Sequence, residues 1–228
     1  MTKADVLKLL EANKNERGMQ NWNRLKFGNL TSYGIGLTQL KKLGKQIGKD
    51  HRLALELWEL PVYDAKTLAT IIDNPKEVTE EQVERQIKDT GFWMLSHAYC
   101  SNLLAKVSFV QKKAEEWAAS QNDLLRRSGY LLLYHIARDN KKLDDAYFEP
   151  YLRTIEKTIL SEENFVKDAM NNALWMIGQR SKPLNKRAIE IAKKIGKIEV
   201  DYGDNSCQAI DCVAHLTSER VQKKIAGM

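Results

Sequence analysis

The sequence predicts an all-α protein built of stacked helix pairs, and three observations support this. Leu, Lys, Ala, Ile and Glu dominate a chain of 228 residues that has only four prolines and twelve glycines, and this composition favours helices. Apolar residues recur at helical spacing, and no segment shows a sustained alternation of period two. Similar helix pairs also recur about every 40 residues, which indicates a repeat array rather than an irregular bundle.

The elements before residue 50 are short and basic. Apolar residues in the first segment have the pattern of an amphipathic helix, and the glycines of NLTSYGIG suit a loop with positive φ. Thr38 is placed to cap the helix that follows this loop. The predicted helices here span 3–13, 22–27 and 38–47.

Helices follow closely after residue 50. Pro61 ends the first of them, because proline cannot continue a helix. Thr79 followed by Gln82 has the spacing of a capping box, and Asp144 or Asp145 can cap a later helix. The predicted helices span 50–60, 63–72, 80–89, 91–106, 109–119, 124–139, 145–160, 163–180, 185–195, 206–216 and 218–226.

The helix predicted at 91–106, GFWMLSHAYCSNLLAK, is apolar on most sides. Trp93, His97, Cys100 and Leu104 share one stripe at steps of four, three and four. A helix of this kind is covered on most sides. We therefore expect it in the middle of the stack, where Trp93 and His97 either fill the core or face a cleft.

Composition excludes several classes of protein. No run approaches the roughly 20 apolar residues of a membrane span, and the first residues lack the apolar core of a signal peptide. The three cysteines form no CxxC pair and no dense cluster with histidine, so we expect buried thiols rather than disulfides or zinc. We expect a cytoplasmic monomer that needs no metal or cofactor.

Positive charge is concentrated at the start of the chain. Residues 1–52 carry eleven Lys and Arg against four Asp and Glu, a net charge of +7, while the whole chain carries +6. A basic end on a neutral body suggests a polyanion as partner. The alternative is that these lysines are solvated faces of helices without a binding role.

The repeat is visible in the second helix of three successive pairs. Small residues recur at 128, 169 and 209, at steps of 41 and 40. This period is typical of HEAT and armadillo arrays, in which second helices line a concave surface. We predict a HEAT-like solenoid, a curved α-α superhelix, as a single domain over 1–228 with the basic helices of 1–49 as its cap.

The concave surface is predicted to bind nucleic acid. Arg127 and Lys167 would lie there one helix pair apart, and cations in a groove bind phosphates. Trp93 and Trp175 would lie on the same wall, where a tryptophan can stack on a base or sugar. The alternative for each tryptophan is a place in the core.

From about Gly34 to Arg180 the sequence resembles the bacterial DNA alkylation repair proteins, the AlkD-type alkylpurine DNA glycosylases with HEAT-like repeats. The resemblance is carried by SYGIGLTQLKKLGKQIGKDHRLALELWELPVYDAKTLATIIDNP, VTEEQVERQIKD, LLRRSGYLLLY and ENFVKDAMNNALWMIGQRSKPLN. It implies duplex DNA held in the concave groove and release of purines alkylated at N3 or N7. Such a purine is already a good leaving group, so the enzyme mainly needs a carboxylate to stabilise the cationic sugar and orient water.

The family's catalytic pattern is altered here. Its motif is roughly Trp-Asp-x-x-Asp with the second Asp catalytic, and this chain reads Trp93-Met94-Leu95-Ser96-His97. His97 therefore stands in the place of the catalytic carboxylate. The same comparison places Asn172 at a second groove tryptophan, Trp175 at an arginine, Arg127 at the phosphate-binding arginine and Leu25 at an N-terminal aromatic.

An imidazole cannot replace that carboxylate. A neutral histidine supplies no fixed anion, and a protonated one opposes the developing cation. His97 could act as a base toward water, or could be a structural residue. Carboxylates from elsewhere remain open as substitutes, at Asp89, Asp123 and Asp168.

Three functions follow from these observations. The first is a DNA glycosylase for alkylated purines. The second is a DNA-binding protein on the same scaffold that recognises damage or unusual DNA shape without catalysis. The third is a helical repeat that binds another protein. The basic N-terminal segment and Arg127 favour the first two, and the missing Asp favours the second over the first on mechanism.

Overall fold

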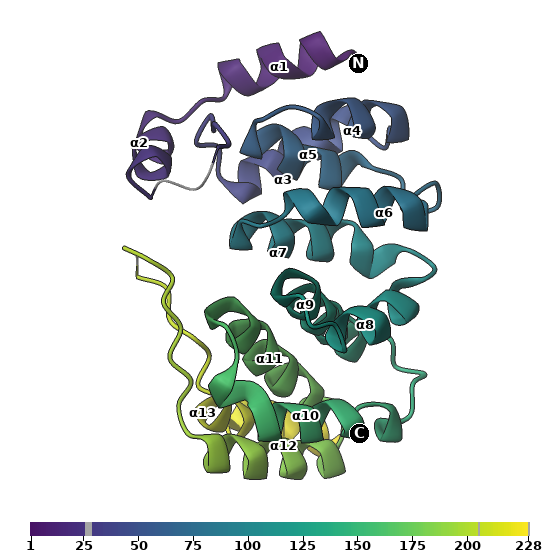
Figure 1. The fold of residues 1–228 in the computed structure, drawn as a ribbon, viewed down its shortest axis with the longest axis vertical. Coiled ribbons are helices and arrows are strands. Elements are labelled where there is room, and N and C mark those ends of the chain that lie inside the picture. Colours follow the sequence, from purple (N-terminus) through teal and green to yellow (C-terminus); the bar gives the residue numbers. More distant parts are fainter. Residues whose placement is uncertain (26–28, 205, 228) are drawn as a thin grey trace. The chain divides into compact units, whose positions relative to one another are not determined.

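The computed structural model describes residues 1–25, 29–204 and 206–227. In these ranges helix follows helix, and the only β-type pairing described there is an isolated bridge between Thr31 and Val62. The predicted all-α class is therefore confirmed. Figure 1 shows the helices, which are α1 (Lys3–Ala12), α2 (Glu16–Leu25), α3 (Leu37–Ile47), α4 (His51–Trp58), α5 (Tyr63–Ile72), α6 (Glu80–Gln86), α7 (Trp93–Asn102), α8 (Val110–Ala118), α9 (Asp123–Asp139), α10 (Glu149–Thr158), α11 (Asn164–Ile177), α12 (Lys182–Ile195), α13 (Cys212–Leu216) and α14 (Glu219–Ala226).

The chain divides into two compact units, Met1–Phe109 and Val110–Met228. In the first unit α5 packs against α3, α4 and α7, and in the second α9 packs against α8 and α11. Successive second helices of the pairs thus lie against each other within each unit, as in a helical repeat. The single domain predicted over residues 1–228 stays a prediction.

Side-chain caps start several helices, and the Thr79 cap is one that the sequence predicts. The Asp50 carboxylate accepts a hydrogen bond from the Leu53 amide at the start of α4, and the Thr79 hydroxyl accepts one from the Gln82 amide at the start of α6. Each cap satisfies a backbone donor that has no partner in the helix. The Gln82 side chain does not close the predicted capping box. Its amide group donates a hydrogen bond of 2.9 Å to the Asp73 carboxylate instead.

The loop before α3 is fixed by a buried carboxylate. Asp64, in the first turn of α5, accepts hydrogen bonds from the Ser32 hydroxyl and from the amides of Tyr33 and Ile35. Gly34 turns this loop with a φ of 68°, a value that glycine adopts without strain. The predicted Thr38 cap is wrong, because α3 begins at Leu37 and Thr38 lies inside it. The N-cap is Gly36, which has no side chain to accept a hydrogen bond.

Several helix boundaries differ from the prediction. α2 begins at Glu16 rather than at residue 22, with the Asn15 side chain accepting from the Gly18 amide. α7 ends at Asn102, and a separate 3-10 turn covers Leu104–Lys106. The largest difference is at the C-terminus, where the helix predicted at 206–216 is only α13, Cys212–Leu216.

Close packing in the second unit positions α9. A Cβ on Gly129 would lie 2.2 Å from the backbone nitrogen of Ala118 at the end of α8, so only glycine allows this approach. Trp117, Tyr130 and Phe148 are almost fully buried in this unit. Burial of such large rings supplies much of the hydrophobic stabilisation of this unit.

No helix among the described residues is long and apolar enough to cross a membrane. Within the same ranges no group of three or more His, Cys, Asp or Glu side chains is arranged to hold a metal ion. Cys100 and Cys212 are buried thiols, and Cys207 is an exposed one.

Candidate nucleic-acid interface

α7 is mostly buried, but it exposes His97. Leu95, Ala98 and Tyr99 are buried, whereas His97 is exposed and Trp93, one turn earlier, is half-buried. The helix therefore presents an imidazole and an indole on its accessible side. His97 therefore does not fill the core, and a cleft at this side of α7 stays a prediction.

Trp93 lies at the edge of an aromatic cluster in the first unit. Its ring is 6.0 Å from that of Phe92, and Phe92 lies 5.4 Å from Trp22, which stacks at 4.7 Å on Tyr63. Burial raises the pKa of Tyr63 to about 12, so its hydroxyl is neutral at physiological pH. The cluster joins α2 to the first residues of α5 and α7.

Asp89, in the first unit, is held by two partners. Its carboxylate accepts a hydrogen bond of 2.9 Å from the Trp58 indole and forms an ion pair of 3.2 Å with Lys66. Lys66 is itself buried, and its ammonium also donates to the Trp58 carbonyl. Removing the Asp89 charge from this group would leave a buried cation without its counter-ion.

Arg127 lies inside the second unit rather than on its surface. The residue is only 4% exposed, and its guanidinium lies over the Phe165 ring at 5.2 Å from the ring centre. Burial raises the pKa of the nearby Tyr202, and the positive charge of Arg127 opposes part of that rise. In this structure Arg127 joins α9 to α11 and lies near Tyr202, in the segment that follows α12.

That segment, described over residues 197–204 and 206–211, is the main feature that the sequence did not predict. Asn164 on α11 exchanges two hydrogen bonds with the backbone of Asp201, and Asn171 donates to the Ile210 carbonyl. Figure 1 shows the segment as a long yellow-green excursion between α12 and α13. Because these bonds hold it against α11, the predicted equivalence of Ala209 with small helical residues is wrong, and Ala209 precedes α13.

Asp168 is enclosed between α11 and the same segment. It is 9% exposed and accepts hydrogen bonds of 2.7 Å from the Tyr202 hydroxyl and 2.9 Å from the Asn172 amide. Asn172 is half-buried and is engaged by this contact. Asp123, the third carboxylate considered from the sequence, forms an ion pair with Arg126.

Lys167 is the cation of α11 that remains accessible. It is half-buried and lines an open cavity of about 600 Å³ together with Asn164 and Lys197. Two lysines and an amide beside one cavity suit an anionic group such as phosphate. Glu199 and Asp201 also line the cavity, so its charge is mixed.

Trp175 is half-buried on α11 and contacts rings from both neighbouring second helices. Its ring centre lies 6.0 Å from that of Tyr134 on α9 and 6.1 Å from that of His215 on α13. Neither Tyr134 nor His215 is among the site residues predicted from the sequence. Their separations from Trp175, 41 and 40 residues, repeat the period of the array and were the available signal.

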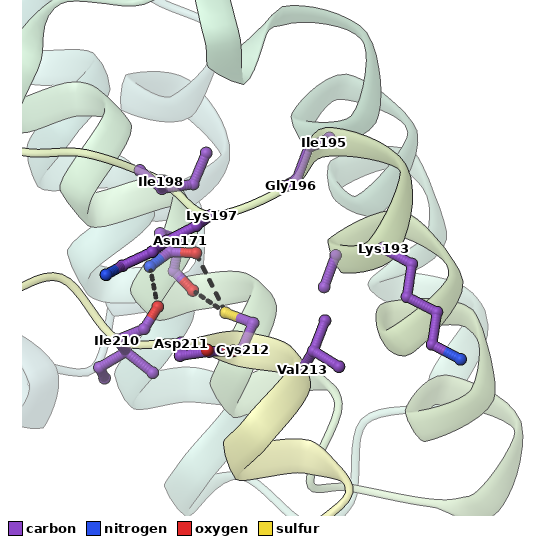
Figure 2. A pocket seen from close by; sticks show the side chains of 11 residues that line it. Asn171, Lys193, Ile195, Gly196, Lys197, Ile198, Ile210, Asp211, Cys212 and Val213 are labelled. Atoms are coloured by element: carbon purple, nitrogen blue, oxygen red, sulfur yellow. Dashed lines mark hydrogen bonds between the residues drawn. The ribbon is translucent and has the colours of Figure 1, made fainter.

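A smaller cavity of about 210 Å³ lies between the end of α12 and the start of α13. Figure 2 shows its polar side, where the Cys212 thiol donates to the Asn171 side-chain oxygen at 3.0 Å. Burial raises the pKa of Cys212 to about 12, so the thiol is neutral. Apolar residues such as Ile195 and Ile198 line it together with Lys193, Lys197 and Asp211, so the lining is mixed.

Trp93 and His97 belong to the first unit, and Arg127, Lys167, Asn172 and Trp175 belong to the second. Their placement in one concave groove therefore stays a prediction. The Leu25 side chain lies outside the described residues, although the residue ends α2.

Comparisons with known proteins agree with this architecture. A model of the DNA alkylation repair enzyme family matches residues 6–199. An uncharacterised protein of Listeria innocua is 29% identical over 195 residues, 84% of each chain, and one of Listeria monocytogenes is 27% identical over 199 residues, 86% of each.

A solved structure is also similar over almost the whole chain. It represents a new family of proteins related to the HEAT-like repeat DNA glycosylases, with affinity for branched DNA structures. The TM-score is 0.86 at 25% sequence identity, and the match covers 99% of this chain and 96% of the other. The predicted HEAT-like helical repeat is confirmed, and with the family match over most of its length this chain belongs to the DNA alkylation repair enzyme family.

Proposed function

We propose that this protein binds DNA through its basic N-terminal segment and the second helices of its repeats, and that it does not excise alkylated purines. Membership of a DNA repair family and the similarity to a protein with affinity for branched DNA support binding. The observation that supports the absence of excision is His97, an exposed imidazole where relatives are expected to have the catalytic Asp.

The carboxylates that could substitute for that Asp already have partners. Asp89 is bound to Trp58 and Lys66, Asp123 to Arg126, and Asp168 to Tyr202 and Asn172. Stabilising an oxocarbenium-like sugar requires an anion aimed at it. A carboxylate already held by a cation or by two donors is a poor source of that field. The alternative is excision with His97 as a base toward water, and release of methylated purines by the unmodified protein and by His97→Ala tests it.

Exposed cations on the first unit support electrostatic binding of DNA phosphates. Lys41, Lys42 and Lys45 are exposed on α3, and Lys3 and Lys8 are exposed on α1. Neutralising phosphates with such side chains releases counterions, which makes binding dependent on salt. We propose a cytoplasmic monomer for the bound form, and sedimentation with and without DNA measures its stoichiometry.

The direct test is the salt dependence of DNA binding. A gel shift on a 20-bp duplex between about 50 and 200 mM salt should show affinity falling steeply, by about 10³-fold or more if six phosphates are contacted. Changing Lys41, Lys42 and Lys45 together to Gln should flatten the slope of log affinity against log salt by up to about three.

The matched control changes Lys182, Lys186 and Lys193 to Gln, three exposed lysines of α12, a first helix of its pair. It removes the same charge and should leave the slope closer to that of the unmodified protein. Equal effects of both triple variants would contradict the proposed surface. Absence of DNA binding by the unmodified protein would contradict the function and favour the protein-binding alternative.

A further inference from the structure

Three rings from successive second helices of the second unit form a column. Tyr134 on α9 and Trp175 on α11 have ring centres 6.0 Å apart with planes inclined by 30°. Trp175 and His215 on α13 have centres 6.1 Å apart in an edge-to-face arrangement at 81°. Each ring occupies the same place in its repeat, since the separations along the chain are 41 and 40 residues.

The column is at the surface and not in the core. His215 is exposed, and Tyr134 and Trp175 are half-buried, whereas rings such as Tyr130 and Trp117 of the same unit are almost fully buried. A helical repeat buries its apolar rings between layers. Three partly accessible rings in a row are therefore available to a ligand.

Cations accompany the column. The Arg138 guanidinium lies 5.8 Å from the centre of the Tyr134 ring, with almost half of its side chain exposed. After the end of α9, burial and the like charges of Lys224 and Arg180 lower the pKa of Lys141, so these three cations lie near one another. Asp139 offsets part of this charge through its ion pair with Arg138.

Rings beside cations suit nucleotides whose bases are not paired. Stacking on aromatic side chains and cation–π contacts with Arg are the usual means of binding single strands. A duplex stacks its bases at about 3.4 Å along each strand and presents no base faces to a protein. Ring centres about 6 Å apart suit splayed, unstacked bases instead.

We propose that Tyr134, Trp175 and His215, with Arg138, form a stacking site for unpaired nucleotides, so that the preferred ligand is DNA with a single-stranded arm. This inference rests on the proposed DNA binding and specifies its substrate. It assigns duplex contacts to the cationic surfaces and single-strand contacts to the ring column.

The test compares three fluorescent DNAs by anisotropy: a 20-bp duplex, a 20-residue oligothymidylate, and a fork that joins the same duplex to two oligothymidylate arms. Tyr134→Leu and Trp175→Leu remove an aromatic face but keep an apolar side chain. Each should weaken binding of the fork and of oligothymidylate about tenfold or more, while duplex binding changes by less than about twofold.

Tyr134→Phe and Trp175→Phe are the matched controls, because they keep an aromatic face. The affinity of each Phe variant for the fork should stay within about threefold of that of the unmodified protein. Thermal unfolding by circular dichroism shows whether each Leu variant is folded, and a folded variant that binds duplex normally serves as its own positive control.

The outcomes separate the two proposals. Fork binding that is the same with Leu, Phe and the original rings overturns the stacking site, as does an equal loss on all three DNAs. An unmodified protein that binds duplex as tightly as fork also overturns the stacking site and leaves the proposed function standing. An unmodified protein that binds none of the three DNAs overturns both.

Discussion

The Tyr202 hydroxyl donates a hydrogen bond of 2.7 Å to Oδ1 of Asp168. This contact fastens the segment after α12 onto α11, next to the Asn164 and Asn171 bonds. The same hydrogen bond engages the Asp168 carboxylate on α11, a helix through which the family is expected to bind DNA. Burial and the adjacent carboxylate raise the pKa of Tyr202 well above its ordinary value, so the hydroxyl remains a donor at neutral pH.

Removing that donor should loosen the segment. We expect Tyr202→Phe to lower the free energy of unfolding by about 1–2 kcal/mol, because the Asp168 carboxylate loses one of its donors. Amides of residues 197–204 should exchange hydrogen faster in the variant. Tyr33→Phe, a tyrosine of the other unit, should leave that exchange unchanged, and equal exchange in Tyr202→Phe and the unmodified protein would contradict this role.

Arg127 and Lys167 should differ in how they act on DNA binding. Lys167→Gln should reduce the salt slope of duplex binding by about one without changing the melting temperature, since Lys167 is accessible beside its cavity. Arg127→Met should mainly lower stability, by about 1–2 kcal/mol, because it removes the contact with Phe165. A folded Arg127→Met protein that loses more DNA affinity than Lys167→Gln would show a direct phosphate contact instead.

Alkaline pH should destabilise the second unit through Cys212. Burial, followed by the charge of Asp211, raises the pKa of Cys212 from 9.0 to about 12, so between these values the folded protein binds a proton that the unfolded chain has lost. Stability is thus full below pH 9 and falls as pH rises toward 12, by at most about 1.4 kcal/mol per pH unit from this group.

Urea unfolding between pH 8.5 and 11 measures this effect. Cys212→Ala should flatten the decline relative to the unmodified protein, and Cys207→Ala, at an exposed thiol, should not. A maleimide should label Cys207 in the folded protein and Cys212 only after unfolding, because the thiolate is the reactive form. Identical pH profiles for all three proteins would remove Cys212 as the cause.

Local signals predicted most of the helices. α5 has the predicted bounds, and the Thr79 cap acts where the sequence predicts it, because a capping side chain and its amide are three residues apart. The α13 boundary depended on contacts that are distant in sequence. Asn164 and Asn171 bind a segment about 37 to 39 residues away, and no local pattern indicates such a bond.

In the candidate site, too, some features follow from local sequence patterns and others depend on distant contacts. Lys167 is accessible, as its repeat position predicts, whereas Arg127 is buried against the Phe165 ring. His97 is exposed, although its helical stripe left both core and surface open. Whether a long cation lies in a groove or under a ring depends on the neighbouring helix, which the sequence does not specify. The ring column was detectable from its repeat period, but its accessibility required the structure.

The central claim is DNA binding without excision, and one assay tests it most directly. The purified protein is incubated with methylated duplex DNA at a concentration where a gel shift shows the DNA fully bound, and released 7-methylguanine and 3-methyladenine are measured over time. We predict release at the rate of DNA alone, for the unmodified protein and for His97→Ala alike. Release above that rate by the unmodified protein, lost in His97→Ala, would contradict the claim and identify His97 as a catalytic residue.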